Sequence, residues 1–339
     1  MARRNPLLPD YHQQKDFFVC DIVDAVPKGD MGSMEHPVFT LSIKPDMKPR
    51  EYRNGSTFLK INPSHKGLAT INDRDVLIYC ISQCIAALNE GRKVNRTVHL
   101  KAYDLLKATN RTTSGRSYQL LQETLARLQG TQIETNIIQG GEERYSVFGL
   151  VDKARATRRT RDGRLQDIEI TLSDWVYDAI ENQHVLTLSR DYFRLRSPIE
   201  RRLYELARKH CGKQKQWQIS LENLLVKTGS QSKLKEFKRM VRKFIANQDH
   251  FPEYIYEMSD NMVTVRPKNI DSHVTALPSL LLSNSAIEEG KQYATGWDIY
   301  NLQEQWRDWV IAKGITVKNT DKHFVSFCKQ KGPYKHNLI

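Results

Sequence analysis

The chain has 339 residues, of which 39% are hydrophobic, and its 52 Lys and Arg against 39 Asp and Glu give a formal net charge of +13. This length accommodates about two domains and a tail, and we expect a soluble globular protein. The positive charge favours a polyanionic partner, and nucleic acid leads over membrane because phosphate neutralisation drives such binding. No apolar run approaches the roughly 18 residues of a spanning helix, and the polar N-terminus does not resemble a secretion signal. We therefore expect a cytoplasmic location and no membrane partner.

The five cysteines are widely scattered, and only Cys80 and Cys84 lie close together, one helical turn apart. No CxxC motif and no Cys/His zinc spacing is present. The sequence therefore predicts small buried thiols rather than a disulfide framework or a metal site, and His210 beside Cys211 is interpreted in the same way.

In the first half of the chain, residues 1–35 lack sustained periodicity, and we expect a flexible N-terminal arm there. Residues 36–188 are expected to form a first domain with strand, helix, strand and helix signals in turn. The expected strands are HPVFTLSIKP, STFLKINPS, TVHLKA, TQIETNII and RYSVFGLVD, and the expected helices are residues 74–90, YDLLKAT and SYQLLQETLARLQ. A basic hairpin, KARATRRTRDGRLQDIEITL with Asp162-Gly163 at its tip, closes the domain.

The second half repeats this order over residues 189–270. A helix in RRLYELARKHC, a strand in WQI, helices in SLENLLVK and SKLKEFKRMVRKFIANQ, and strands in PEYIYEM and NMVTVRP follow one another. The segment SDWVYDAIENQHVLTLSRDYFRL connects the two halves. The predicted fold class is therefore α+β, with two tandem winged helix-turn-helix domains.

Beyond residue 270 we expect a linker at 271–290 and a small helical C-terminal region at 291–339. WDIYNLQEQWRDWVIAKG and TDKHFVSFCKQ are its two expected helices. Aromatic residues alternate there with lysines: Trp297, Trp306, Trp309, Phe324 and Phe327 with Lys313, Lys318, Lys322 and Lys329. This pattern fits stacking of single-stranded bases or contact with a helicase or primase, and it fits a small packed helical pair equally well.

The helix near residues 234–245 is the strongest candidate for a DNA contact. At about 100° per residue, its apolar residues Leu234, Phe237, Met240, Val241, Phe244 and Ile245 fall on one side, opposite a cationic face. Between Lys227 and Lys243 there are seven Lys or Arg and one acid, Glu236, whereas a solvated helix face usually mixes both signs. In a helix-turn-helix the start of the second helix enters the major groove. The candidate base or phosphate readers are Ser230, Gln231, Ser232, Lys233 and Lys235, and Lys227, Lys238, Arg239, Arg242 and Lys243 complete the basic cluster.

The first domain offers a second set of candidates. Arg116, Gln119, Glu123 and Arg127 share one face of the SYQLLQETLARLQ helix, and Arg111 and Arg116 flank the preceding turn, where they can reach phosphate or a guanine edge. The basic hairpin adds Arg155, Arg158, Arg159 and Arg161, which can follow the backbone or a narrow minor groove. Solvated surface charge is the alternative for both groups.

An enzyme is the class of protein to exclude. The chain has no GxxxxGK[ST] phosphate loop, and it lacks the His-apolar-His pair that a nicking enzyme would need beside its tyrosine. The acidic pairs Asp73/Asp75 and Glu142/Glu143 are explained by a helix start and a hairpin turn. We therefore expect neither catalysis nor a metal or other cofactor.

From about Glu35 to Pro267 the sequence resembles the replication initiator protein A family of theta-replicating bacterial plasmids. The resemblance is carried by GLATINDRDVLIYCISQ, RTVHLKAYDLLKATNRTTSGRSYQLLQETLARLQGTQIETNI, LSDWVYDAI, VLTLSRDYFRLRSPIERRLYELARKHCG and SLENLLVKTGS. It implies tandem winged helices that bind repeated duplex sites at an origin, promote opening and recruit host replication proteins. It also implies a monomer–dimer equilibrium, with self-association through the first winged helix, and repression of the protein's own promoter. A plain transcriptional repressor on the same fold is the alternative, and the C-terminal region, which a repressor does not need, separates the two.

Overall fold

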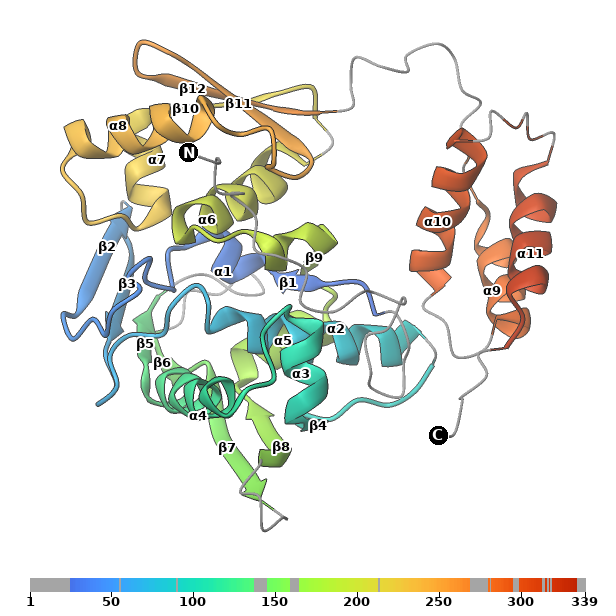
Figure 1. Cartoon of the computed structure of the whole chain (residues 1–339), viewed down its shortest axis with the longest axis horizontal. Helices are drawn as coiled ribbons and strands as arrows, with labels where there is room; N and C mark the ends of the chain where they lie inside the picture. The colour runs from blue at the N-terminus through green and yellow to red at the C-terminus, as the bar shows by residue number, and fades with distance from the viewer. Residues whose placement is uncertain are drawn as a thin grey trace.

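The computed structural model describes residues 25–54, 56–89, 91–136, 145–158, 165–212, 214–268, 280, 282–294, 299–312, 315, 317 and 319–333. Helices and short antiparallel strands are interspersed along these residues (Figure 1), which confirms the expected α+β class. Residues 1–24, most of the predicted N-terminal arm, lie outside them.

The first unit is built around a three-stranded antiparallel sheet with the order β4-β8-β7. Its elements are α2 (Arg74–Asn89), β4 (Thr97–Lys101), α3 (Ala102–Ala108), α4 (Gly115–Gly130), β7 (Val151–Arg158) and β8 (Leu165–Leu172). Helix α4 begins where the Ser114 side chain accepts a hydrogen bond from the Ser117 amide, as expected of a serine N-cap. It contacts β7, while α3 contacts β8.

A second sheet with the order β2-β3-β5-β6 flanks this unit. Its strands are β2 (Arg50–Asn54), β3 (Thr57–Asn62), β5 (Gln132–Thr135) and β6 (Ser146–Gly149). The expected strand HPVFTLSIKP is wrong, because residues 36–45 form only an isolated bridge, between Thr40 and Thr70. The ladder begins instead at Arg50, so β2 was missed.

The second unit repeats the order of the first. It consists of α6 (Pro198–Leu206), the π-helical turn η2 (Ala207–Cys211), β10 (Trp217–Ser220), α7 (Leu221–Thr228), α8 (Leu234–Ile245), β11 (Tyr254–Ser259) and β12 (Met262–Pro267). Its sheet has the order β10-β12-β11. In both units a strand between two helices pairs with the second strand of a later hairpin, so the predicted repeat of element order is confirmed.

The segment between the units pairs with the start of the described chain. It contains α5 (Asp174–Glu181), β9 (Val185–Thr187) and the 3₁₀ turn η1 (Arg190–Arg194), and β9 pairs antiparallel with β1 (Lys28–Asp30), which leads into α1 (Met31–Glu35). Ala25, Val26 and Met34 are buried. The expectation of a flexible arm is therefore wrong for residues 25–35, because they gain a strand partner and a place in the core.

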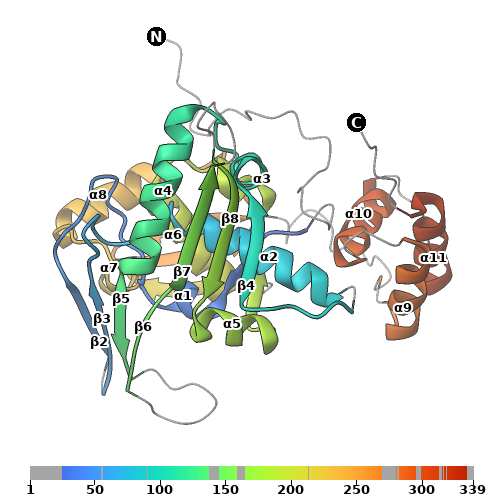
Figure 2. The same ribbon diagram turned by 90° about the horizontal axis from the view of Figure 1, so that it is seen from below.

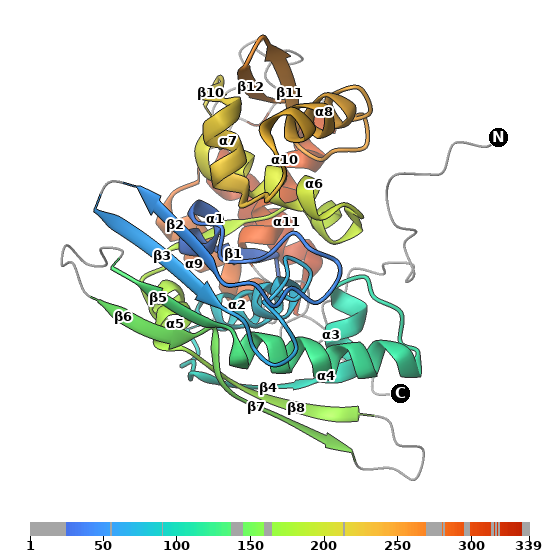
Figure 3. The same cartoon turned by 90° about the vertical axis from the view of Figure 1, so that its left-hand side faces the viewer.

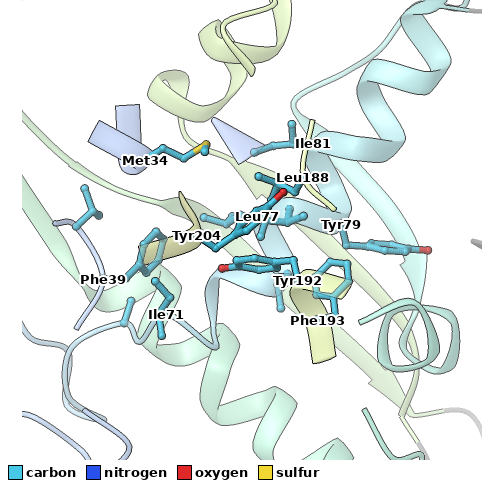
Figure 4. Close-up of a cluster of buried hydrophobic side chains, with 14 of the residues drawn as sticks. Met34, Phe39, Ile71, Leu77, Tyr79, Ile81, Leu188, Tyr192, Phe193 and Tyr204 are labelled. Carbon is cyan, nitrogen blue, oxygen red and sulfur yellow. The ribbon is translucent and has the colours of Figure 1, made fainter. Parts of the chain in front are cut away.

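One cluster of buried apolar residues runs through both units, from Ala25 to Val265. Figure 4 shows part of it: Met34 and Phe39 from the N-terminal segment, Leu77 and Ile81 from α2, and Tyr204 from α6 converge with Tyr192 and Phe193 of η1. The boundary predicted between residues 188 and 189 thus falls inside a continuous core.

Buried ion pairs also join the two units. Glu205 of α6 accepts hydrogen bonds from the Tyr192 hydroxyl at 2.6 Å and from Arg202 at 3.1 Å, and it forms an ion pair with Arg74 of α2. Arg201 forms an ion pair with Asp75 at 2.6 Å. Burial by itself lowers the pKa of Arg74, but the charges of Glu205 and Asp30, the Tyr192 side chain and the hydrogen bond to Glu205 together outweigh it, and the pKa is raised. These contacts fix α6 on α2 and so hold the second unit against the first.

The C-terminal region contains α9 (Asn284–Tyr293), α10 (Ile299–Ala312) and α11 (Thr320–Lys331), which lie beside the rest of the molecule in Figures 1 and 2. They have a separate apolar cluster around Trp306, Leu302 and Phe324. Both expected helices are confirmed. The predicted linker at 271–290 is wrong where α9 begins, since Ala286 and Gly290 are buried against this cluster.

Candidate nucleic-acid interface

Helix α8 has one buried and one cationic face. Phe237, Val241 and Phe244 are buried, and Phe244 packs edge to face against Phe251 and Tyr256 with ring centroids 4.9 and 5.3 Å apart. The exposed cations at and along the helix are Lys233, Lys235, Arg239, Arg242 and Lys243. Leu234 and Glu236 are also exposed, and Glu236 forms an ion pair with Arg239 at 3.0 Å. The predicted division of this helix is therefore confirmed, and the cations lie where a duplex can reach them.

The conformation of the turn between α7 and α8 is fixed by a helix cap, a glycine and contacts with β2. The Ser220 side chain caps the start of α7, and Gly229 ends the helix with φ of +71°, a left-handed conformation that favours glycine. The Tyr52 hydroxyl of β2 lies 3.4 Å from the Gly229 carbonyl and 3.5 Å from the Gln231 amide nitrogen. The turn of the second unit thus rests on the sheet that flanks the first.

A Gly229→Ala substitution is expected to disturb this turn. The added Cβ would come within 2.7 Å of the Pro37 Cβ and 3.1 Å of the Tyr52 hydroxyl, in a backbone conformation that alanine rarely adopts. We expect a loss of about 1–3 kcal/mol in the free energy of unfolding, measured by urea denaturation. Alanine at Gly91, which also has positive φ but has nothing within 4 Å of its added Cβ, is the control. A larger loss at Gly91 would contradict the packing argument.

Other residues of the predicted cluster have partners inside the protein. Lys227 forms an ion pair with Glu35 of α1, so its ammonium already has a carboxylate partner, and its DNA contact stays a prediction. His210 and Lys227 together hold the pKa of Glu35 far below its usual range, against the opposing effect of burial. Lys238 is half-buried and donates to the Asn261 side chain at 2.6 Å. Ser230 and Ser232 are half-buried in the turn, where the Ser230 hydroxyl accepts from the Ser232 amide at 3.4 Å.

In the first unit, α4 exposes Arg116 and Gln119 as expected. Arg127 instead donates two hydrogen bonds of 2.7 Å to Asp73, and Arg111 forms an ion pair with Asp75 at 3.0 Å. These two arginines attach α4 and the turn before it to the start of α2, and their DNA contacts stay predictions. Figure 1 places α4 and α8 on the same side of the molecule as β2 and β3, and in Figure 3, which faces that side, the two strands lie to one side of both helices.

The basic hairpin is described only in part. Arg155 is 63% exposed and lies 3.6 Å from Glu169 on the paired strand. Arg158 is the last residue of β7, and Arg159 and Arg161 lie outside the described residues. Arg155 is thus available to a partner at little cost, because an exposed ion pair contributes about 0–1 kcal/mol.

The loop of residues 41–49 is an exposed cationic segment that was not among the predicted site residues. Lys44 and Lys48 are exposed there beside the apolar side chains of Ile43 and Met47. Pro45 and Pro49, which disfavour a ladder strand, were the signal that this segment is a loop.

Comparisons with known proteins define the family. Residues 28–256 match the family described as "RPA: Replication initiator protein A". A protein of Wigglesworthia glossinidia brevipalpis described as "Putative replication protein" is 40% identical over 245 residues, which cover 71% of this chain and 88% of that protein. The chain belongs to the replication initiator protein A family.

Two solved structures of domains 2 and 3 of RctB also match. They superpose with TM-scores of 0.44 and 0.47 at 12% and 10% identity, and they cover 68% and 70% of this chain and 94% and 96% of theirs. The family membership rests on the sequence matches.

Among the described residues, no helix is both long and apolar enough to cross a bilayer. In the same part of the chain, no three His, Cys, Asp or Glu are grouped so that they could hold a metal ion.

Proposed function

We propose that the chain initiates replication by binding repeated double-stranded sites at an origin through two winged helix-turn-helix units. The observation that carries the proposal is the cationic face of α8, whose opposite face is buried in the core. Membership of the initiator family supports the replication role. The protein acts by binding, without catalysing a reaction, and it does so in the cytoplasm.

The repeated topology supports the assignment of winged helices. Each unit has a helix, a strand, two helices and a hairpin in this order, with β5 and β6 inserted before the hairpin of the first unit, and the sheet orders β4-β8-β7 and β10-β12-β11 are equivalent. Helices α4 and α8 take the place of recognition helices, and the hairpins β7–β8 and β11–β12 take the place of wings. In this arrangement the helix and the wing of one unit can contact the same duplex.

The two helices have different roles on DNA. The start of α8 enters the major groove, where Gln231, Lys233 and Lys235 meet base edges, and Arg239, Arg242 and Lys243 follow the phosphate backbone. Arg116 and Gln119 of α4 read the next major groove, one helical turn along the duplex. Arg155 and Arg158 of the first hairpin are proposed to contact the phosphate backbone.

Selection of duplexes from a random pool tests this assignment. The full chain should enrich one family of sequences, and a Gln231→Ala or Lys233→Ala variant should enrich a different one, because a good side-chain contact to a base edge discriminates by about 1–3 kcal/mol. Lys66→Ala, an exposed lysine outside the helix-turn-helix, should enrich the wild-type sequence. Identical selections by all variants would place recognition elsewhere.

The proposal includes duplex opening. Bending and wedging by two units bound at several repeats supply the energy without a nucleotide motor. A negatively supercoiled circle with repeated copies of the enriched sequence should gain permanganate-reactive thymines when the chain binds. Binding without such reactivity would favour the alternative function, a transcriptional repressor.

We also propose that monomers bind the repeats, while dimers form through the first unit and repress the promoter.

The C-terminal helices are proposed to contact single-stranded DNA or a host helicase or primase. Trp309 is 40% exposed and stacks on His323 with ring centroids 5.9 Å apart, and the Lys329 ammonium lies 4.3 Å from the centre of the Tyr293 ring. Trp306 and Phe324, by contrast, are buried in the cluster, and Trp297, Lys313 and Lys318 lie outside the described residues. An exposed tryptophan beside lysines can stack an unpaired base.

A Phe324→Ala variant tests whether helices α9–α11 are needed for duplex binding. Loss of a buried aromatic costs about 3–5 kcal/mol, so we expect α9–α11 to unfold while affinity for the selected duplex stays unchanged. Tryptophan fluorescence during urea titration and duplex anisotropy measure the two effects. Phe327→Ala, at a half-buried position on α11, is the milder control. A parallel loss of duplex affinity in Phe324→Ala would contradict the separation.

A further inference from the structure

The loop of residues 41–49 carries two apolar side chains in solvent. Ile43 is 79% exposed and Met47 is 54% exposed. Single exposed apolar residues are common on protein surfaces, but two in one short loop, each followed by an exposed lysine, Lys44 and Lys48, form a distinct surface.

The conformation of the loop is fixed by Asp46. Its side chain accepts hydrogen bonds from the Lys48 amide at 3.1 Å and from the Thr40 hydroxyl at 3.4 Å, and it forms an ion pair with Arg50. Its carbonyl accepts from the Leu68 amide at 2.8 Å. A loop ordered before binding loses less conformational entropy when it meets a partner.

Contacts place this loop between the two units. Gly67, on which the loop packs, leaves no room for a side chain, since an added Cβ would lie 2.9 Å from the Asp46 nitrogen. The turn that contains Gly67 also contains Ser64, which lies against Gly130 at the end of α4. On the other side the loop leads into β2, whose Tyr52 touches the α7–α8 turn. The loop is therefore flanked by the C-terminal end of α4 and by the α7–α8 turn.

We infer that Ile43 and Met47 form an apolar wedge that enters the minor groove and partly unstacks a base step when α8 occupies the adjacent major groove. The inference rests on the proposed function. Apolar side chains flanked by cations act in this way in proteins that kink duplexes, where isoleucine and methionine are among the residues inserted. Unstacking one step between the two bound units is a direct route to opening an origin.

The reach of the chain fits this arrangement. Met47 precedes Tyr52 by five residues, which span at most about 17 Å when extended. Neighbouring major and minor grooves on one face of a duplex are half a helical turn apart, about 17 Å. The tip of the loop is thus no farther from Tyr52, which touches the α7–α8 turn, than the spacing between adjacent grooves.

The charge of the loop favours a duplex over a protein or a membrane. Its single acid, Asp46, has a side chain only 11% exposed and is paired with Arg50, so the exposed charges of residues 41–49 are the two lysines. Lys44 and Lys48 can each neutralise a phosphate beside the groove. The two apolar side chains suit the apolar interior of the base stack.

The test uses duplexes enriched from a random pool by the full-length wild-type chain, with 2-aminopurine at successive positions around the protected segment. Wild type should raise the fluorescence at one step. In the Ile43→Ser, Met47→Ser double variant this rise should fall at least about fivefold, because serine leaves the step stacked.

The Kd of the double variant for the enriched duplex should stay within about threefold of the wild-type value, because the lost contacts and the avoided cost of unstacking offset each other. Val147→Ser, which removes a 46% exposed apolar side chain on β6, should behave like wild type.

Each other outcome is decisive. An undiminished signal from the double variant, or no rise with bound wild type, overturns the wedge and leaves the proposed function standing. A loss of affinity above about thirtyfold, roughly 2 kcal/mol, also overturns it, because the loop would then hold the duplex rather than unstack it. An altered oligomeric state with the signal kept assigns the loop to a protein contact. Failure of wild type to enrich any duplex contradicts the proposed function itself.

Discussion

An Arg239→Glu, Arg242→Glu variant is expected to bind the selected duplex at least about 100-fold more weakly than wild type. Both side chains are exposed on the cationic face of α8, and hydrogen bonds to charged groups contribute about 1.5–3 kcal/mol each. The slope of log K against log salt should become shallower by about two, since each lost phosphate contact removes about 0.9. Fluorescence anisotropy between about 50 and 200 mM salt measures both quantities.

The control for this variant has the same change in net charge. Lys93→Glu with Lys215→Glu alters exposed lysines before β4 and before β10, outside the helix-turn-helix. It should weaken binding only through the smaller overall charge, without the change of about two in slope. Equal effects in both variants would mean that the net charge of the chain, rather than the face of α8, holds the DNA.

Replacing Glu205 with Gln is expected to lower the free energy of unfolding by about 3–5 kcal/mol, the usual cost of breaking a buried ion pair from one side. Glu205 is fully buried, and its carboxylate faces the guanidinium groups of Arg74 and Arg202, which are also buried. The amide leaves two buried cations with less compensating charge. Urea denaturation followed by circular dichroism measures the loss.

Glu257→Gln is the matched control for this substitution. Glu257 forms an ion pair with Arg266 at 3.3 Å, and both side chains are about half exposed. Such pairs contribute about 0–1 kcal/mol, so little change is expected. If the Glu205→Gln variant unfolds at the same urea concentration as this control, the buried network does not hold α6 on α2.

Local patterns in the sequence predicted most helices and strands. Helix α8 was predictable because its apolar and basic residues alternate with the helical period, and the hairpin β11–β12 because two strand-like runs surround Ser259-Asp260. The segment HPVFTLSIKP was misassigned because a strand needs a ladder partner as well as suitable residues. The pairing of β1 with β9 joins Lys28 to Thr187, a contact that no local pattern predicts.

The candidate site was predictable only where its charges face solvent. Arg111, Arg127 and Lys227 have the composition of a DNA surface, yet their carboxylate partners lie 36, 54 and 192 residues away along the chain. Sequence alone does not distinguish an arginine that meets phosphate from one that meets a distant aspartate. The exposed arginines of α8 were identified correctly because the buried stripe on the same helix fixes which side faces outward.

Hydroxyl-radical footprinting of the full chain on its selected duplex tests the central claim most directly. If both units grip one face of the double helix, two protected segments should appear about one helical turn apart, roughly 10–10.5 base pairs between centres. The Arg239→Glu, Arg242→Glu variant should lose one of them first. A single protected segment, or two that respond equally to this variant, would contradict the account.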